Sequence, residues 1–487
     1  MSEYVPRIFE DTHDWFKRIN REFQFREPVD LVCKMTPEVV EAASGHTFMM
    51  TCVVGEDLVI PAGAHITFEV RESWDTHLGN CFRRGIRTVG NREQIKACYG
   101  AWTDVVCSNA EVVLAHEASY GRIMDLVDIV VVEGELQPGD EVRIILGPND
   151  GCLLQAQKFA QVAIFPVAVD LKGDGEYRRA AVSPQVKVVG AFPDRFRIFA
   201  PGTVASNAEF DARVLPVDVY SFNPATGYRG TGLLASTPDL DFPKTVEMDT
   251  GIHPLGVNIR VKDRAERGVH YITAADPNTG LSGRSNPIGV DFVPEGNIYF
   301  GELHSQMWHS MGTGTTAEYF EWGRDVGGLD FCAPANHYNW RFEVTDEIWH
   351  ELIDTCNAYN DPGNFATLVS YEWGGTGGSG HRNVYFRGDS GEFTFWYKKV
   401  HKDIQEFWDS LGDQDVLTAP HHLKAGCAIG RFGLIGFSGL LRSVRSGAFL
   451  KRVGLRVCNR HLLWGIALGW LGERIRIMGL PIRGVIT

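Results

Sequence analysis

The sequence predicts a mixed fold, with N-terminal β-sandwich-like modules followed by an incomplete α/β domain. Three observations lead to this prediction. Up to about residue 290, apolar residues fall in short runs separated by turn residues such as Pro138-Gly139-Asp140. From Asn297 onward, apolar runs typical of strands alternate with amphipathic stretches typical of helices. After residue 428, no clean helical or strand period persists.

The β-rich part divides into two modules, because a segment near residues 172–180 separates two sets of apolar runs. We predict a first module over residues 1–175 and a second over residues 176–296. Isolated histidines are more often packed or surface residues than ligands, so no site is predicted at His116, His253 or His270. The expected strands are 57–60, 112–114, 129–132 and 142–146, then 186–189, 196–199, 212–219, 257–261 and 271–274.

Composition and charge narrow the function classes. The 487 residues are 44% hydrophobic and 22% charged, as in an ordinary globular protein, and carry a net charge of −14. Residues 431–487 contain ten Lys or Arg and one acid, so they carry +9 and the preceding 430 residues carry −23, which together give −14. Because the first 430 residues are acidic, their charge gives no reason to expect a nucleic-acid partner. No apolar run reaches the ~18 residues of a membrane span, no secretory signal is indicated, and the ten cysteines form no C-x-x-C pair. We therefore expect a cytoplasmic protein with neither a membrane nor a nucleic-acid partner.

The α/β domain is expected to open with a strand at residues 297–300. Thr315 or Thr316 can cap the first helix, and Thr345 can cap a second whose first turn holds two acids. The second helix has one apolar stripe, formed by Ile348, Trp349, Leu352, Ile353 and Cys356. The remaining elements are expected to be strands at 329–333, 365–371, 383–386 and 416–419 and a helix at 404–411.

Metal-ligating residue types recur where these strands end. The first strand leads into Glu302 and His304, and the second ends at His337. The third ends at Glu372, and the fourth at His421-His422. In parallel α/β folds the carboxyl ends of the strands converge on one rim, where active sites form. Imidazole and carboxylate groups suit Zn, Mn or Fe, so we predict a divalent metal site at this rim.

Six short motifs between residues 297 and 426 carry a family resemblance: Tyr299-Phe300-Gly301-Glu302-Leu303-His304-Ser305-Gln306, Gly312-Thr313-Gly314, Glu318-Tyr319-Phe320, Arg324-Asp325, Leu329-Asp330-Phe331 and Tyr371-Glu372-Trp373. Together they resemble the DUF3604 family, which is of uncharacterised function. That family is related to the PHP (polymerase and histidinol phosphatase) superfamily of metal-dependent phosphoesterases. The resemblance implies a distorted α/β barrel with a metal cluster of one to three ions at its mouth.

Position by position, the resemblance implies the following ligands. Glu302 and His304 match an opening Asp/Glu-x-His motif, His337 a second His position, and Glu372 a bridging carboxylate. His421 or His422 matches a later His position. The chain departs from the PHP pattern at Gln306, where PHP proteins have a second His, and this leaves the number of ions open.

The function that follows is a metal-dependent hydrolase acting on a small-molecule substrate, a phosphate or related anionic ester. Glu372 would bridge two ions, and His381, Arg382 and Lys424 are candidates for anchoring an anionic substrate. The alternative is a non-catalytic β-sandwich binding protein, or an inactive frameshifted product. The hydrolase and the non-catalytic interpretations differ in whether the last barrel strands are present. Those strands would supply a further acid and an Asp-x-His pair.

The composition of the tail favours the view that the barrel, predicted over residues 297–428, is incomplete. We predict that residues 429–487 are an aberrant basic tail translated out of frame. Permitted codons for residues 440–448, read two bases later, give Val-Glu-Ile-Cys-Ser-Ile-Trp-Gly. Codons for residues 471–480, read with the same offset, give Gly-Gly-Thr-Asp-Ser-Asp-Tyr-Gly. Both peptides resemble DUF3604 motifs in the right order. A basic amphipathic tail that binds a membrane or a partner is the other interpretation. Under a frameshift, we expect the Leu and Trp residues of the tail to be poorly packed.

Overall fold

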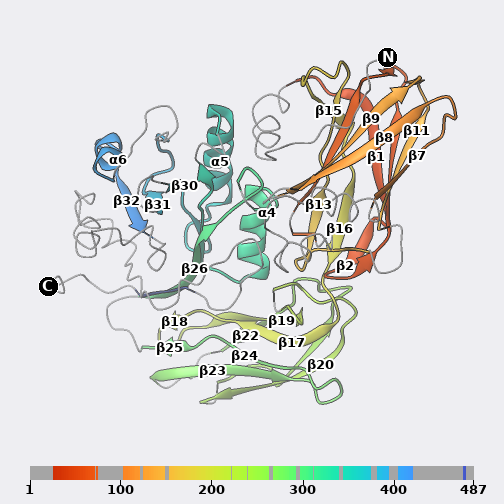
Figure 1. Cartoon of the computed structure of the whole chain (residues 1–487). Helices are drawn as coiled ribbons and strands as arrows, with labels where there is room; N and C mark the ends of the chain where they lie inside the picture. The colour runs from red at the N-terminus through yellow and green to blue at the C-terminus, as the bar shows by residue number, and fades with distance from the viewer. Residues whose placement is uncertain are drawn as a thin grey trace, which may run out of the picture. The chain divides into compact units, whose positions relative to one another are not determined.

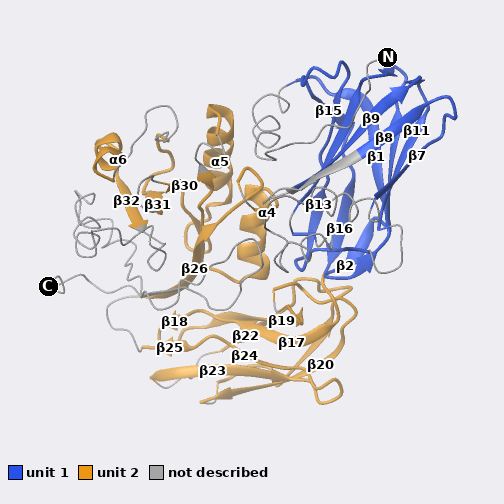
Figure 2. Ribbon diagram, in the orientation of Figure 1, with its two compact units in different colours: residues 1–189, 341–343 blue, residues 190–340, 344–487 orange. Residues whose placement is uncertain are grey.

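The computed structural model describes residues 26–71, 73–74, 103–120, 124–147, 153–220, 222–238, 240–262, 267–291, 297–310, 312–338, 344–374, 381–393, 404–420 and 475–478. The chain divides into two compact units (Figure 2). Unit 1 comprises residues 1–189 with 341–343, and unit 2 comprises residues 190–340 with 344–487. Each unit is described by itself, with the element numbers of Figure 1.

Unit 1 is built from strands alone in the part of the chain that is described. A nine-stranded sheet has the order β7-β11-β4-β1-β15-β14-β6-β9-β8, and a three-stranded sheet has the order β13-β16-β2. The pairs β10-β5 and β12-β3 complete the unit. Its strands are β1 (Val29–Thr36), β2 (Val39–Glu41), β3 (Gly45–His46), β4 (Phe48–Val54), β5 (Ile60–Pro61), β6 (His65–Arg71), β7 (Thr103–Cys107), β8 (Val113–Tyr120), β9 (Met124–Glu133), β10 (Glu135–Leu136), β11 (Glu141–Leu146), β12 (Leu154–Gln155), β13 (Gln161–Ile164), β14 (Val167–Asp170), β15 (Arg178–Val182) and β16 (Gln185–Val189).

Alternation of apolar and polar residues gives unit 1 its core. In β1, the side chains of Val29, Leu31, Cys33 and Met35 are buried, and those between them are partly or fully exposed. The sequence prediction placed a module boundary between residues 175 and 176. Strands β15 and β16 follow that point, and β15 pairs with β1 and β14 while β16 pairs with β2 and β13. These long-range pairings keep residues up to Val189 within unit 1.

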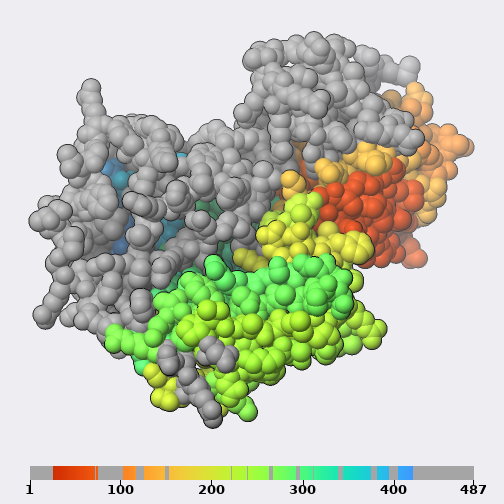
Figure 3. Space-filling model, turned by 90° about the horizontal axis from the view of Figure 1, so that it is seen from below, coloured from red at the N-terminus to blue at the C-terminus, as the bar shows by residue number. Residues whose placement is uncertain are grey.

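Unit 2 begins with a β-sandwich, coloured yellow-green to green in Figures 1 and 3. One sheet has the order β17-β19-β22, and the other has the order β18-β25-β23-β20-β21, with β24 on β23. A buried cluster that includes Phe196, Val214, Ile259 and Ile272 lies between them. The strands are β17 (Pro193–Phe199), β18 (Thr203–Val204), β19 (Phe210–Asp218), β20 (Arg229–Thr237), β21 (Thr245–Asp249), β22 (Val257–Val261), β23 (Gly268–Ala275), β24 (Ser282–Arg284) and β25 (Ile288–Val290). The strand-rich content of residues 26–291 agrees with the β-sandwich-like prediction.

The rest of unit 2 alternates strands and helices. Two four-stranded sheets have the orders β29-β27-β26-β33 and β28-β30-β31-β32. The elements are β26 (Ile298–Ser305), α4 (Thr316–Glu321), the π-helical turn η3 (Trp322–Val326), β27 (Phe331–Pro334), β28 (His337–Tyr338), α5 (Asp346–Tyr359), β29 (Ala366–Thr367), β30 (Ser370–Gly374), β31 (His381–Phe386), α6 (Ile404–Ser410), β32 (Val416–Pro420) and β33 (Ile475–Met478).

Local sequence signals explain where helices α4 and α5 form. Thr315 caps α4 and forms a capping box with Glu318, whose carboxylate accepts from the Thr315 backbone N–H at 2.7 Å. Thr345 caps α5, and the five residues of the predicted apolar stripe are all buried. They pack against aromatic residues of the second sheet, and Trp349 meets Tyr371 edge to face at 5.8 Å. Further along the same face of β30, Trp373 stacks on Phe407 of α6 at 4.3 Å.

Strand direction sets which side chains share a rim. β26, β27 and β29 are parallel neighbours, and β28 is parallel to β30. β31 is antiparallel to β30, and β32 is antiparallel to β31, so β32 runs in the same direction as β30. The amino end of β31 therefore lies at the same edge as the carboxyl ends of β28, β30 and β32.

The described part of the tail is β33, which pairs antiparallel with β26 from Ile298 to Gly301. This ladder is made by backbone groups, so it carries no information about whether the side chains of the tail were selected to pack here. The other predictions for residues 429–487 concern residues outside the described part of the chain. Within the described residues, no helix has the length and apolar character needed to cross a membrane.

Candidate metal centre

The pairing register of the second sheet brings three polar side chains into one row. His337 of β28 lies opposite Glu372 of β30, and Glu372 lies opposite Asn383 of β31. His381 lies two residues before Asn383, opposite Gly374, and so points to the same face of β31. The candidate site is therefore assembled by sheet register from segments up to 46 positions apart in the numbering of the chain, from His337 to Asn383.

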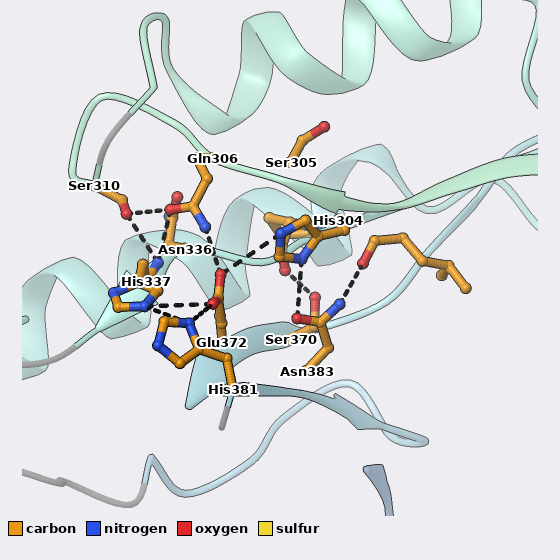
Figure 4. A network of polar contacts seen from close by, with 12 residues as sticks. His304, Ser305, Gln306, Ser310, Asn336, His337, Ser370, Glu372, His381 and Asn383 are labelled. Carbon is orange, nitrogen blue, oxygen red and sulfur yellow. Dashed lines mark hydrogen bonds and ion pairs between the residues drawn. The ribbon is translucent and has the colours of Figure 1, made fainter. Parts of the chain in front are cut away.

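Two imidazole nitrogens converge on the Oε1 oxygen of Glu372 (Figure 4). His381 Nδ1 lies 2.6 Å from this oxygen, and His337 Nε2 lies 3.3 Å from it. The two imidazole nitrogens are 3.0 Å apart. The Glu372 side chain is only 2% exposed, whereas those of His337 and His381 are 11% and 29% exposed. Within the described residues, these are the one set of three His, Cys, Asp or Glu donors that lie within 4.8 Å of one another.

This geometry fits a divalent metal ion. In a tetrahedral site with bonds of ~2.0–2.2 Å, the ligand atoms lie about 3.3–3.6 Å apart. Of the three distances here, 3.3 Å matches that spacing, while 3.0 and 2.6 Å are hydrogen-bond lengths that fall short of it by about 0.3 and 0.7 Å. Side-chain movements that lengthen the shortest contact by about 0.7 Å would make room for an ion. Two imidazoles and one carboxylate, with a further position open, form the ligand type of catalytic zinc sites.

The Oε2 oxygen of Glu372 faces a different pair of residues. The amide nitrogen of Gln306 donates to it at 2.7 Å, and His304 Nε2 lies 3.7 Å away. Figure 4 shows Gln306 and His304 on one side of the carboxylate and His337 and His381 on the other. Glu372 thus lies between two groups of side chains, which is where a bridging carboxylate would be.

The loop after β26 holds Gln306 in place. The Gln306 Oε1 atom accepts from the backbone N–H of His337 at 2.9 Å and from the Ser310 hydroxyl. A Cβ added at Gly312 would lie within 1.8 Å of the Gln306 carbonyl oxygen, so only glycine lets the loop fold back this closely. This contact gives the Gly312-Thr313-Gly314 motif a structural reason.

Glu302, which was predicted to be a ligand, has its carboxylate engaged elsewhere. Its Oε1 accepts from the His304 backbone N–H at 2.6 Å. Its Oε2 accepts from the Ser305 hydroxyl at 2.6 Å and from the Tyr319 hydroxyl at 2.7 Å. Glu302 and His304 are two apart on the same strand, but the local bond to the His304 N–H turns the carboxylate back along the backbone. The structure does not bring Glu302 into the donor set.

Two tyrosines near the site have raised pKa values, mainly because of burial, and nearby carboxylate charges add to the effect. Burial raises the pKa of Tyr385 well above its usual value, and the charges of Glu302 and Glu372 raise it further. Burial also raises the pKa of Tyr319, with Cys332 and Glu302 adding to the effect. Two carboxylates in a partly dehydrated interior favour a cation over an anion at this place.

Arg382 does not join the site. It alternates with His381 and Asn383 along β31, so it points to the opposite face, where its guanidinium lies 5.9 Å from the centre of the Trp408 ring. Burial lowers the pKa of Arg382 to about 10. As an anchor for a substrate at Glu372, Arg382 is on the wrong side of the strand. The other predicted residues, His421, His422 and Lys424, lie outside the described residues.

Three features of the site were missing from the sequence prediction or had another role there. His381 was expected to anchor substrate, and the structure places its Nδ1 among the metal donors. Gln306 was noted only as a departure from a family pattern, yet it binds Glu372 directly. Asn383 was not considered, although its Oδ1 lies 3.0 Å from His304 Nδ1. The alternation of His381 and Asn383 in a strand was the available signal for both residues.

Comparison with known proteins gives one family match. Residues 328–424 match the family DUF3604, described as a protein family of unknown function. The match confirms the DUF3604 resemblance for this segment. The DUF3604 segment contains His337, Glu372, His381 and Asn383. Strand β26 with His304, and Gln306 directly after it, precede this segment.

Other comparisons add no argument. No curated protein matches the chain. Among solved structures, the adhesin InvE of Yersinia pseudotuberculosis is 9% identical, with 53% of this chain covered and a TM-score of 0.17. A marsupial T cell receptor is 8% identical, covering 54% of this chain and 72% of the receptor, with a TM-score of 0.20. The chain spans 58% of the adhesin's length. At these TM-scores, neither likeness bears on fold or function.

Proposed function

We propose that the protein is a metal-dependent hydrolase of the PHP-like type, acting on a small anionic ester such as a phosphoester. The observation that carries the proposal is the three-donor set around Glu372 Oε1, made by His337, His381 and a carboxylate that is only 2% exposed. A buried carboxylate among imidazoles is costly unless its charge is matched, and a divalent cation would match it.

Each residue of the site has a proposed role. His337, His381 and Glu372 would hold a Zn, Mn or Fe ion. When bound, such an ion lowers the pKa of a bound water toward ~7 and polarises the scissile bond. His304, a quarter exposed and 3.7 Å from Glu372, is placed to exchange a proton with a reacting group. The substrate class rests on the relation to the PHP phosphoesterases that the DUF3604 resemblance implies, and on the cationic character that a metal would give the site.

We also propose that residues from 297 onward form a distorted PHP-like barrel whose last strands are altered by a frameshift after about residue 428, and that the protein acts in the cytoplasm. Residues 431–487 contain a single acid, Glu473, and a single histidine, His461, so they offer no Asp-x-His pair. An incomplete ligand set would leave ions loosely held and activity weak.

Metal-dependent hydrolysis tests the function. The full chain, stripped with EDTA and reloaded with Zn²⁺ or Mn²⁺, is assayed on bis(p-nitrophenyl) phosphate and p-nitrophenyl phosphate. We expect slow turnover that requires metal and is lost in Glu372→Gln. Turnover that persists without metal, or in the variant, would contradict the proposal. If the chain binds no metal at all, the β-sandwich binding protein becomes the better interpretation.

The frameshift has a separate test in the gene. The nucleotide sequence across the codons for Lys424 to Leu480 should read, two bases later, as the two DUF3604-like peptides. A repaired chain should then turn over phosphoesters faster than the chain as given. Codons that give unrelated peptides in that frame would end the frameshift proposal without affecting the metal site.

A further inference from the structure

We propose that Gln306 makes this site bind one divalent ion tightly and a second one weakly. The inference rests on the proposed metal site and concerns its second position, on the Oε2 side of Glu372. There Gln306 presents an amide N–H, which can donate a hydrogen bond but cannot bind a metal.

The orientation of the Gln306 amide is fixed by its partners. The His337 backbone N–H can only donate, and it lies 2.9 Å from one end of the amide and 2.8 Å from the Ser310 Oγ atom, so the amide end that faces it is assigned as the carbonyl oxygen. The Ser310 hydroxyl also donates to this oxygen. The NH₂ end must therefore face Glu372 Oε2, at 2.7 Å. A flip would set N–H against N–H at His337 and, in the metal-free site, oxygen against oxygen at Glu372. Turning the carbonyl oxygen toward an ion would therefore cost the bond from the His337 N–H to Gln306.

His304, which can exchange a proton while no second ion is bound, is also oriented as a ligand for such an ion on this same side. The Tyr385 hydroxyl donates to the Leu303 carbonyl at 2.8 Å, so its oxygen accepts from Asn383 Nδ2 at 2.7 Å. This leaves Asn383 Oδ1 as the acceptor for His304 Nδ1, at 3.0 Å. A neutral His304 then carries its hydrogen on Nδ1 and its lone pair on Nε2, which faces Glu372. An imidazole whose second nitrogen donates to a fixed oxygen is the usual arrangement of a metal-binding histidine.

The two sides of Glu372 therefore offer unequal sets of donors. The Oε1 side has three donor atoms, from His337, His381 and Glu372. Among the described residues, the Oε2 side pairs His304 Nε2 with the carboxylate oxygen, while Gln306 occupies the place of a third ligand. Metal sites in proteins use three or four protein ligands, so a second ion would be held less tightly than the first.

Zn²⁺ binding to the full chain tests this inference. After EDTA treatment and reloading, we expect the wild type to keep one equivalent of Zn²⁺ through gel filtration in metal-free buffer. Calorimetry should show a second event at least about tenfold weaker, the smallest effect usual for a disturbed ligand shell. Gln306→His adds an imidazole and should keep two equivalents. Gln306→Leu removes the amide without adding a ligand and should keep one.

Each contrary result has a distinct meaning. Two equivalents of equal affinity in the wild type, or one in a folded Gln306→His variant, would overturn the inference and leave the metal site standing. No Zn²⁺ binding would overturn the proposed function and the inference together. If Gln306→His does not fold, the wild type loaded with Mn²⁺ decides by electron paramagnetic resonance. One equivalent should give the spectrum of isolated ions, and a spin-coupled pair at that loading would refute the inference.

Discussion

Replacing Glu372 by Gln should remove metal binding with little change in the stability of the metal-free protein. The substitution keeps the size of the side chain but removes its charge. Losing a partner of a metal ligand already costs ~10–100-fold in affinity. Glu372 is within 3.3 Å of both imidazole nitrogens and would bind the ion itself, so we expect a loss of at least about 100-fold. This corresponds to about 3 kcal/mol, since each factor of ten is about 1.4 kcal/mol.

The effect on folding is expected to be small because two terms oppose each other. The carboxylate accepts charge-assisted bonds from Gln306 at 2.7 Å and from His381 at 2.6 Å, each worth about 1.5–3 kcal/mol, and the amide can keep one of them. Removing a charge that is 2% exposed relieves a desolvation cost of similar size. We expect the metal-free variant to lie within about 2 kcal/mol of the wild type.

Thermal unfolding with and without Zn²⁺ measures both effects. At a Zn²⁺ concentration 100 times the wild-type dissociation constant, binding stabilises the wild type by about 2.7 kcal/mol. A 100-fold weaker variant would gain only about 0.4 kcal/mol at that concentration. Glu302→Gln is the matched control, because the Glu302 carboxylate is bonded to His304 N–H, Ser305 and Tyr319. A Glu372→Gln variant with the full shift, or equal losses in both variants, would refute this reasoning.

Three further predictions test the geometry. A Cβ at Gly374 would lie 3.4 Å from the His337 ring. Measured by competition with a chelator, the Zn²⁺ affinity should therefore be kept in Gly374→Ala and lowered in Gly374→Val. Equal affinities of the two variants would contradict this packing. A hydrogen bond to Glu321 and burial raise the pKa of Tyr359 to about 12. A raised folded-state pKa stabilises below the unfolded value near 10, and the contribution is lost as pH rises from ~10 through ~12. In chemical denaturation over that pH range, the free energy of unfolding of Tyr359→Phe should therefore fall less than that of the wild type. The same pH dependence in both proteins would count against the hydrogen bond between Tyr359 and Glu321. Burial raises the pKa of Cys33 and of Cys107, but Cys33 is 1% exposed and Cys107 is half-buried. Mass spectrometry after native alkylation should find Cys107 labelled before Cys33, and the reverse order would argue against the strand register of β1.

Short-range patterns predicted the helices of the α/β part well. The Thr345 cap and the five-residue stripe of α5 depend on neighbours within one or two turns, and the structure contains both. Residues 365–371 were expected to form one strand. They form β29 and the start of β30, because Ala366 pairs with β27 while Ser370 pairs with β31. A change of partner between two sheets depends on long-range contacts and leaves no mark in the local pattern.

The structure brings together some of the residues expected at the rim, and their roles remain predictions. His337 and Glu372 meet because β28 and β30 are parallel neighbours in register, as the convergence of strand ends suggested. The role of His381 could not be predicted, because β31 is antiparallel and brings its amino end to the same edge. Gln306 depends on a loop conformation that is set by Ser310 and Gly312. Local spacing does not contain that information.

The most direct test of the metal site is anomalous diffraction from crystals of the full chain loaded with Zn²⁺, measured on both sides of the zinc absorption edge. We predict an anomalous peak ~2.0–2.3 Å from His337 Nε2, His381 Nδ1 and a carboxylate oxygen of Glu372. Zinc bound elsewhere in the crystal with no peak at these three residues, or a peak that leaves Glu372 uncoordinated, would contradict the assignment.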